Sequence, residues 1–83
     1  MPYTEPETDV LRAFGQRVRR AREARGWSQE DLAAEAGMDR TYVGGIERGE
    51  RNPALLNINR LALALGENLT GFLPHRKGRR QTR

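Results

Sequence analysis

Arg40, Thr41 and Tyr42 are consecutive near the middle of the chain, and their side chains suit hydrogen bonding to DNA. Arginine can donate two hydrogen bonds to the O6 and N7 atoms of one guanine, while threonine offers a hydroxyl group and a methyl group that fits thymine. A recognition helix meets base edges with its first residues. Arg40 and Thr41 are the first residues of a predicted helix, so base contacts are predicted for both. Tyr42 either contacts the sugar-phosphate backbone or fills a gap between helices.

Further candidate contacts surround this tripeptide. Arg51 is predicted to reach a base. Gly44 either lets DNA approach the helix closely or is a tolerated defect, because Gly44 and Gly45 each cost a helix interior roughly 1 kcal/mol relative to alanine. The predicted contacts with phosphates involve polar side chains, including one at a helix N-terminus: Gln29, Tyr42, Arg48, Asn52 and Arg17. The alternative for each arginine is a solvated surface charge.

No set of residues with catalytic or metal-binding spacing stands out. The chain has no cysteine and one histidine, His75, which excludes disulfides, thiolate metal sites and a histidine-based zinc site. It also lacks a glycine-rich phosphate loop. Asp31 and Glu47 are acidic, but structural roles explain both residues, so neither indicates a catalytic site. We therefore expect no enzymatic activity, no metal and no cofactor.

Residues 28–48 are predicted to form the helix-turn-helix that positions these side chains. Ser28 can cap its first helix, and Asp31 can complete a capping box. Gly37 supplies the left-handed backbone conformation that ends this helix. Asp39 can cap the second helix. The inward faces would carry apolar residues at helical spacing: Leu32, Ala33, Ala36, Val43 and Ile46.

Three more helices are predicted around this pair, giving an all-α class. The first runs from about Asp9 to Arg25 with Thr8 or Asp9 as its cap, and residues 1–8 are read as a disordered N-terminal arm. Helices over 54–65 and 69–73 follow, so that residues 9–74 form one compact five-helix bundle. Its further core residues are predicted from helical spacing: Leu11, Phe14, Val18, Ala21, Leu55, Ile58, Leu61, Ala62 and Leu65.

The helix over 54–65 also has apolar residues away from its predicted core face. Leu56 and Leu63 are seven residues apart, so this helix is apolar on two sides and is either deeply buried or has a second partner. A domain of 83 residues without disulfides or metals commonly gains support from oligomerisation. The predicted dimer interface consists of Leu56, Leu63, Leu69, Phe72 and Leu73. The alternative for Leu69 and Phe72 is that they close the monomer core.

The net charge of +4 comes from the C-terminal segment. Five of the 15 basic residues lie from Arg76 onward, so residues 1–75 hold 10 basic against 11 acidic residues, a net charge of −1. We read residues 75–83 as a basic disordered tail. DNA binding by the domain must therefore rest on where its basic residues cluster. The sequence contains no long apolar run and no secretion signal, so a cytoplasmic protein is expected.

The stretch from Phe14 to Leu73 resembles the Cro/repressor-like (XRE) helix-turn-helix family. The resemblance is carried by residues spread over this stretch: Arg22, Gly26, Ser28, Gln29, Leu32, Ala33, Gly37, Arg40, Thr41, Tyr42, Ile46, Glu47, Arg48, Gly49, Arg51, Asn52, Pro53, Leu61, Ala62, Leu65 and Gly66. Within the family, the run from Asp39 to Val43, followed by Gly45 to Arg48 and by Arg51 and Asn52, is most similar to the controller proteins of restriction–modification systems.

The resemblance implies a lambda-repressor-like domain that binds a palindromic operator as a symmetric homodimer. It implies an ion pair between Arg22 and Glu47, and it shows Ala54 where the family usually has a serine or threonine cap. The resemblance implies a transcriptional regulator, and among the regulators it favours a restriction–modification controller. The alternatives are an antitoxin or a small phage-type repressor of the same fold, or a protein-interaction module without DNA. The expected partners are double-stranded DNA, a second copy of the chain and RNA polymerase, with no membrane.

Overall fold

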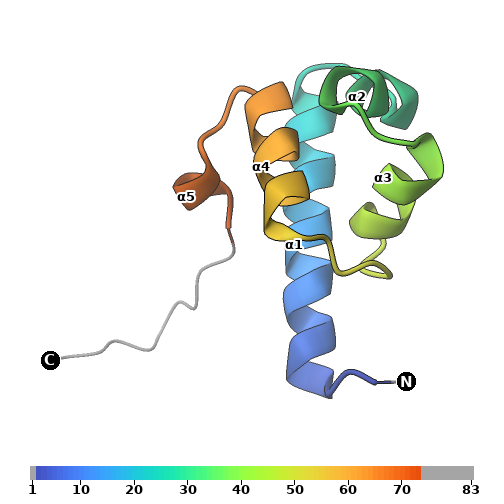
Figure 1. Cartoon of the computed structure of the whole chain (residues 1–83), viewed down its shortest axis with the longest axis vertical. Coiled ribbons are helices and arrows are strands. Elements are labelled where there is room, and N and C mark those ends of the chain that lie inside the picture. The colour runs from blue at the N-terminus through green and yellow to red at the C-terminus, as the bar shows by residue number, and fades with distance from the viewer. Residues whose placement is uncertain (1, 74–83) are drawn as a thin grey trace, which may run out of the picture.

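Five helices make up the part of the chain that the computed structural model describes, residues 2–73 (Figure 1). They are α1 (Glu5–Ala24), α2 (Gln29–Ala36), α3 (Arg40–Glu47), α4 (Leu55–Ala64) and α5 (Leu69–Phe72). This segment contains no strand, so the predicted all-α class is confirmed. The predicted basic tail, 75–83, lies outside the described residues. Among the five helices, none is long and apolar enough to cross a lipid bilayer.

The start of α1 differs from the prediction. The helix begins at Glu5, so the predicted helix start at Asp9 is wrong, and residues 5–8 are helical instead of part of a disordered arm. Thr4 caps it: the Thr4 hydroxyl accepts a hydrogen bond from the Glu7 amide, and the Glu7 carboxylate accepts one from the Thr4 amide at 2.9 Å. Pro6 does not prevent this, because proline is tolerated in the first turn of a helix.

The hydrophobic core lies where α1 runs along the other helices (Figure 1). It consists of small and branched apolar side chains around two phenylalanines: Phe14, Val18, Ala21, Leu32, Ala33, Ala36, Val43, Ile46, Leu61, Ala62, Leu65 and Phe72. Leu55 is not part of it, contrary to prediction, because 61% of its surface is exposed. Leu11 and Ile58 are only partly buried.

Phe72 belongs to this core and not to a dimer interface, which corrects the prediction. It is completely buried, and its ring meets the ring of Phe14 edge to face, with a centroid distance of 5.5 Å. Such edge-to-face pairs stabilise the fold beyond the contribution of apolar burial. The short helix α5 is therefore the element that closes this end of the core.

A close approach of α1 to the end of α3 depends on Gly15. A Cβ atom at this position would lie 2.6 Å from the carbonyl oxygen of Glu47, closer than real Cβ atoms come. Any larger residue would push α1 away from α3. Gly15 therefore allows α1 to support the helix that carries the predicted base contacts.

Candidate nucleic-acid interface

The start of α3 presents its first two side chains to solvent. Asp39 caps the helix as predicted, since its carboxylate accepts hydrogen bonds from the Thr41 amide, at 3.0 Å, and from the Thr41 hydroxyl. Arg40 and Thr41 are exposed, while Val43 and Ile46 on the opposite side of α3 are buried in the core. The helix therefore has the shape of a recognition helix, with a polar, accessible start.

The Asp39 cap makes the stability of α3 depend on pH. The hydrogen bond from the Thr41 side chain, followed by that from the Thr41 backbone, lowers the pKa of Asp39 below its ordinary value. A carboxylate with a depressed folded-state pKa stabilises the fold above its unfolded pKa, and that stabilisation is lost as the pH falls through the folded pKa.

We expect Asp39→Asn to reveal this titration, because asparagine is also a good cap but does not ionise. Wild-type melting temperature should fall relative to that of Asp39→Asn as the pH decreases below about 4. Thermal melts of both proteins between pH 7 and pH 2.5 measure the difference. A difference that stays constant over this range would contradict the role of the charged cap.

A buried ion pair holds the helix-turn-helix against α1. Arg22 Nε donates to one oxygen of Glu47 at 2.7 Å, and its Nη2 donates to the other at 2.9 Å. The side chains are only 10% and 3% exposed. The third Arg22 nitrogen donates to the Trp27 carbonyl at 2.8 Å. The hydrogen bond to Glu47 raises the pKa of Arg22. This is the pairing that the resemblance implied.

Gln29, the first residue of α2, joins the ion pair at the end of α3. Its Nε2 donates to Glu47 Oε1 at 3.0 Å, and that amide nitrogen carries a second hydrogen. Gln29 and Arg40 also line one surface hollow of about 480 Å³, together with Arg22, Ser28 and Glu30. The Asp31 amide in the first turn of α2 is paired with the Ser28 hydroxyl. The other amides of that turn have no intrahelical acceptor, which favours an anion such as a phosphate there. The structure thus brings a predicted phosphate contact beside a predicted base contact.

The end of α3 and the following loop carry two more arginines. Arg48 Nη2 lies 3.1 Å from Glu50 Oε1 on the surface, and this hydrogen bond raises the pKa of Arg48 and lowers that of Glu50. The Arg51 guanidinium lies over the ring of Tyr42, 5.7 Å from its centroid. Tyr42 is half-buried and accepts a hydrogen bond from Asn57 of α4 at 3.2 Å. Three arginines thus border the exposed side of α3.

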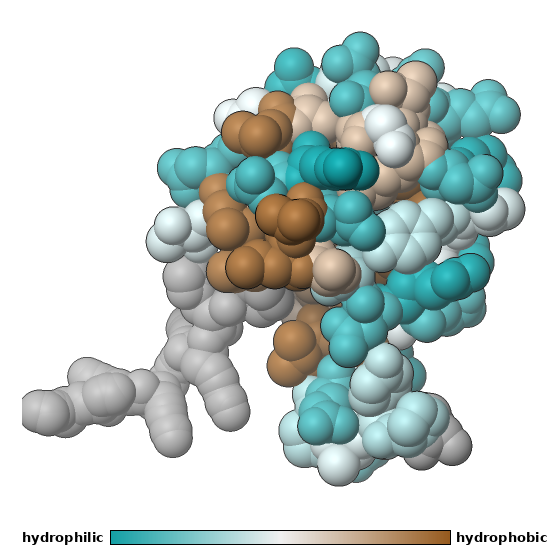
Figure 2. Space-filling model, viewed as in Figure 1, coloured by the Kyte–Doolittle hydropathy of each residue, from teal (hydrophilic) through white to brown (hydrophobic). Residues whose placement is uncertain are grey.

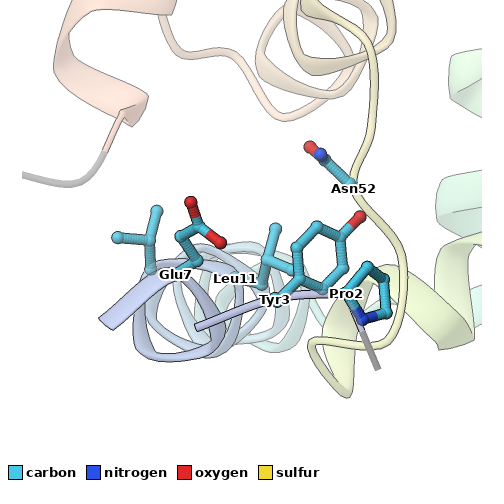
Figure 3. A pocket seen from close by; sticks show the side chains of 6 residues that line it. Pro2, Tyr3, Glu7, Leu11 and Asn52 are labelled. Atoms are coloured by element: carbon cyan, nitrogen blue, oxygen red, sulfur yellow. The ribbon is translucent and has the colours of Figure 1, made fainter. Parts of the chain in front are cut away.

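Three predicted DNA contacts lie elsewhere or are covered. Arg17 needs correcting: it pairs with Glu67 at 2.6 Å and lies over the Phe72 ring, so it holds α5 against α1. Gly44 is buried beneath the side chains of Gln29 and Arg48. Asn52 faces the first residues of the chain, where it lines a hollow of about 470 Å³ with Pro2, Tyr3, Glu7, Val10 and Leu11 (Figure 3).

A second, apolar surface lies on α4. Leu55, Leu56 and Leu63 are 61%, 73% and 66% exposed, and Figure 2 shows apolar side chains gathered over this helix. Leu69 and Leu73 are partly buried. We refer to Leu55, Leu56 and Leu63 as the α4 leucine surface. Leu56 and Leu63 belong to the predicted dimer interface, and Leu55 joins them on the surface because it lies outside the core.

Sequence reasoning missed three residues that shape the interface. Asn57 holds the Tyr42 hydroxyl, Glu50 pairs with Arg48, and Gly15 lets α1 approach α3. Glu50 could have been noticed, because a carboxylate two residues after an arginine in a turn can reach it. Asn57 and Gly15 act across 15 or more residues of chain, and no local pattern indicates such contacts.

Comparisons with known proteins find the same fold and identify the family of the chain. The family model described as Helix-turn-helix matches residues 18–72. A protein of Neisseria meningitidis described as a hypothetical transcription factor is 46% identical over 67 residues, which cover 80% of this chain and 63% of that protein. The chain therefore spans less than two thirds of that relative.

Two solved structures are similar to this chain over most of their length. The restriction–modification controller protein C.AhdI from Aeromonas hydrophila is 51% identical, with a TM-score of 0.73 over 78% of this chain and 97% of that one. The controller protein C.Esp1396I, solved as a tetramer in complex with its natural 35 base-pair operator, is 32% identical, with a TM-score of 0.71 over 76% of this chain and 83% of that one.

Proposed function

The chain belongs to the helix-turn-helix family, and from this premise we propose that it is a sequence-specific transcriptional regulator. It binds a palindromic operator as a homodimer and serves as the controller of a restriction–modification system. The observation that carries this proposal is the exposed start of α3, where Arg40 lines a hollow together with Gln29 at the α2 N-terminus and Thr41 is exposed next to it in the chain. The similarity to two controller proteins supports the narrower assignment.

In this proposal α3 enters the major groove with its first residues toward the bases. Arg40 reads a guanine and Thr41 contacts the adjacent base pair. The α2 N-terminus and Gln29 hold a phosphate, which fixes the depth and angle of α3. Arg48 and Arg51 bring further positive charge to the neighbouring DNA. The regulator acts by binding alone and catalyses no reaction.

The α4 leucine surface supports the proposed homodimer. Its three leucines lie on one helix of a small domain, and exposed apolar patches of this kind mark interaction sites. A two-fold dimer makes such a surface self-complementary and places two α3 helices on half-sites about one DNA turn, roughly 34 Å, apart. Leu69 and Leu73, which are partly buried, would add to the contact.

We expect the double substitution Leu56→Ser and Leu63→Ser to give a monomer. Both side chains are mostly exposed, so the fold should persist while the apolar contact between protomers is lost. Sedimentation at tens of micromolar measures the assembly state. Val10→Ser, which alters an exposed apolar residue on α1, is the matched control and should remain a dimer. A dimeric double variant, or a monomeric wild type, would contradict this interface.

Footprinting tests the controller assignment. The wild-type protein should protect two half-sites upstream of its own gene and near a neighbouring restriction endonuclease gene. A regulator bound there lies beside the promoter, so we propose RNA polymerase as its further macromolecular partner. Protection at a toxin gene or at phage promoters would assign the protein to the antitoxins or phage-type repressors instead. An absence of protection at its own promoter would contradict autoregulation.

A further inference from the structure

Two adjacent glycines in the recognition helix lie beneath arginine side chains. Gly44 and Gly45 are both buried, although glycine in a helix interior is unfavourable. A Cβ atom on Gly45 would lie 2.7 Å from Cγ of Arg51 and 3.2 Å from its Nε. A Cβ atom on Gly44 would lie 3.2 Å from Nη1 of Arg48. The aliphatic stem of Arg51 thus occupies the space that a side chain at position 45 would fill.

The far end of Arg51 is also fixed by contacts. Its guanidinium lies over the Tyr42 ring, and the Tyr42 hydroxyl is held by Asn57 of α4. A guanidinium stacked on an aromatic ring keeps its plane and its donors in a defined direction. Arg51 therefore follows the surface of α3 from Gly45 to Tyr42 instead of extending freely into solvent from its loop.

We propose that Gly45 is a positioning residue for Arg51, and that it determines which base pair Arg51 reads. This rests on the proposed function. The missing side chain lets a loop arginine lie against the recognition helix, which brings a second guanidinium to the groove in addition to that of Arg40. Gly44 provides the equivalent, looser space for Arg48. The helix-destabilising glycines are explained by the arginines they accommodate.

Gly45→Ala, Arg51→Ala and the double variant form the test, because a cycle of this kind isolates the coupling between two residues. Each protein is used to select sequences from random duplexes, and its affinity for the wild-type consensus is measured. We expect Gly45→Ala to lower that affinity about tenfold and to relax the preference at the base pair that Arg51→Ala also relaxes. The double variant should bind no worse than Arg51→Ala. Gly71→Ala, an exposed helical glycine in α5, is the matched control and should bind like wild type.

Thermal melts of the same proteins give an independent readout. Arg51 is exposed and can move away, so Gly45→Ala should melt at or above the wild-type temperature. A lower melting temperature that persists when Arg51→Ala is added would show that the alanine disturbs α3 itself, and would contradict the positioning role. Wild-type binding and preference in Gly45→Ala, or additive losses in the double variant, would overturn the positioning role. A wild-type protein that selects no sequence would instead refute the proposed function.

Discussion

Glu47→Ala is expected to lower the free energy of unfolding by about 3–5 kcal/mol, because it leaves the buried Arg22 guanidinium without its partner. A small domain has roughly 5–15 kcal/mol in total, so this loss removes a large share of its stability. Gln29 would also lose its acceptor on α3. Urea denaturation followed by circular dichroism measures the change.

A double substitution separates the stability lost with the ion pair from the free-energy cost of leaving one buried charge unpaired. Arg22→Met combined with Glu47→Leu replaces both partners by apolar side chains, and such swaps are often neutral or stabilising. The double variant should therefore be markedly more stable than Glu47→Ala. A free energy of unfolding for Glu47→Ala within about 1 kcal/mol of the wild-type value would contradict the role of this ion pair in holding the helix-turn-helix against α1.

Arg40→Ala is expected to cause the largest loss of specific DNA binding. A bidentate arginine–guanine contact contributes about 1–3 kcal/mol, and a dimer makes it in both half-sites, so affinity should fall by roughly 30-fold to 10⁴-fold. Binding to unrelated DNA should fall far less, because phosphate contacts dominate it. Fluorescence anisotropy with specific and scrambled duplexes at one salt concentration measures both.

Arg20→Ala is the matched control for Arg40→Ala. Both residues are exposed arginines, but Arg20 lies on α1 and belongs to a solvated face. Replacing Arg20 by alanine removes the same charge and leaves α3 unchanged. Equal losses of specific affinity in the two variants would show that the effect is one of net charge, and would contradict base reading by Arg40.

The helix-turn-helix was predictable because its determinants are local. Ser28 with Asp31, Gly37 and Asp39 mark the helix ends, and the structure has each of them in its predicted role. The start of α1 was equally local, since Thr4 and Glu7 have capping-box spacing, but the flanking prolines suggested an unstructured arm. Proline in a first turn is compatible with a helix, so composition was the wrong criterion there.

The errors in the site arose from contacts between distant segments. Arg17 is a basic residue on the first helix, as expected of a phosphate contact, but its side chain pairs with Glu67, which is 50 residues away. Leu55 has the helical spacing of a core residue, yet spacing defines a face and not how far along the helix the core extends. The positions of Arg48 and Arg51 over Gly44 and Gly45 depend on side-chain conformations that no sequence pattern specifies.

Selection from a random duplex library tests the central claim most directly. The full chain is incubated with the library at near-physiological salt, and bound duplexes are amplified and sequenced over several rounds. We predict enrichment of a palindrome whose half-sites are spaced by about one helical turn and contain a guanine whose preference depends on Arg40. An enriched pool with no common sequence, or no enrichment at all, would contradict sequence-specific regulation by this surface.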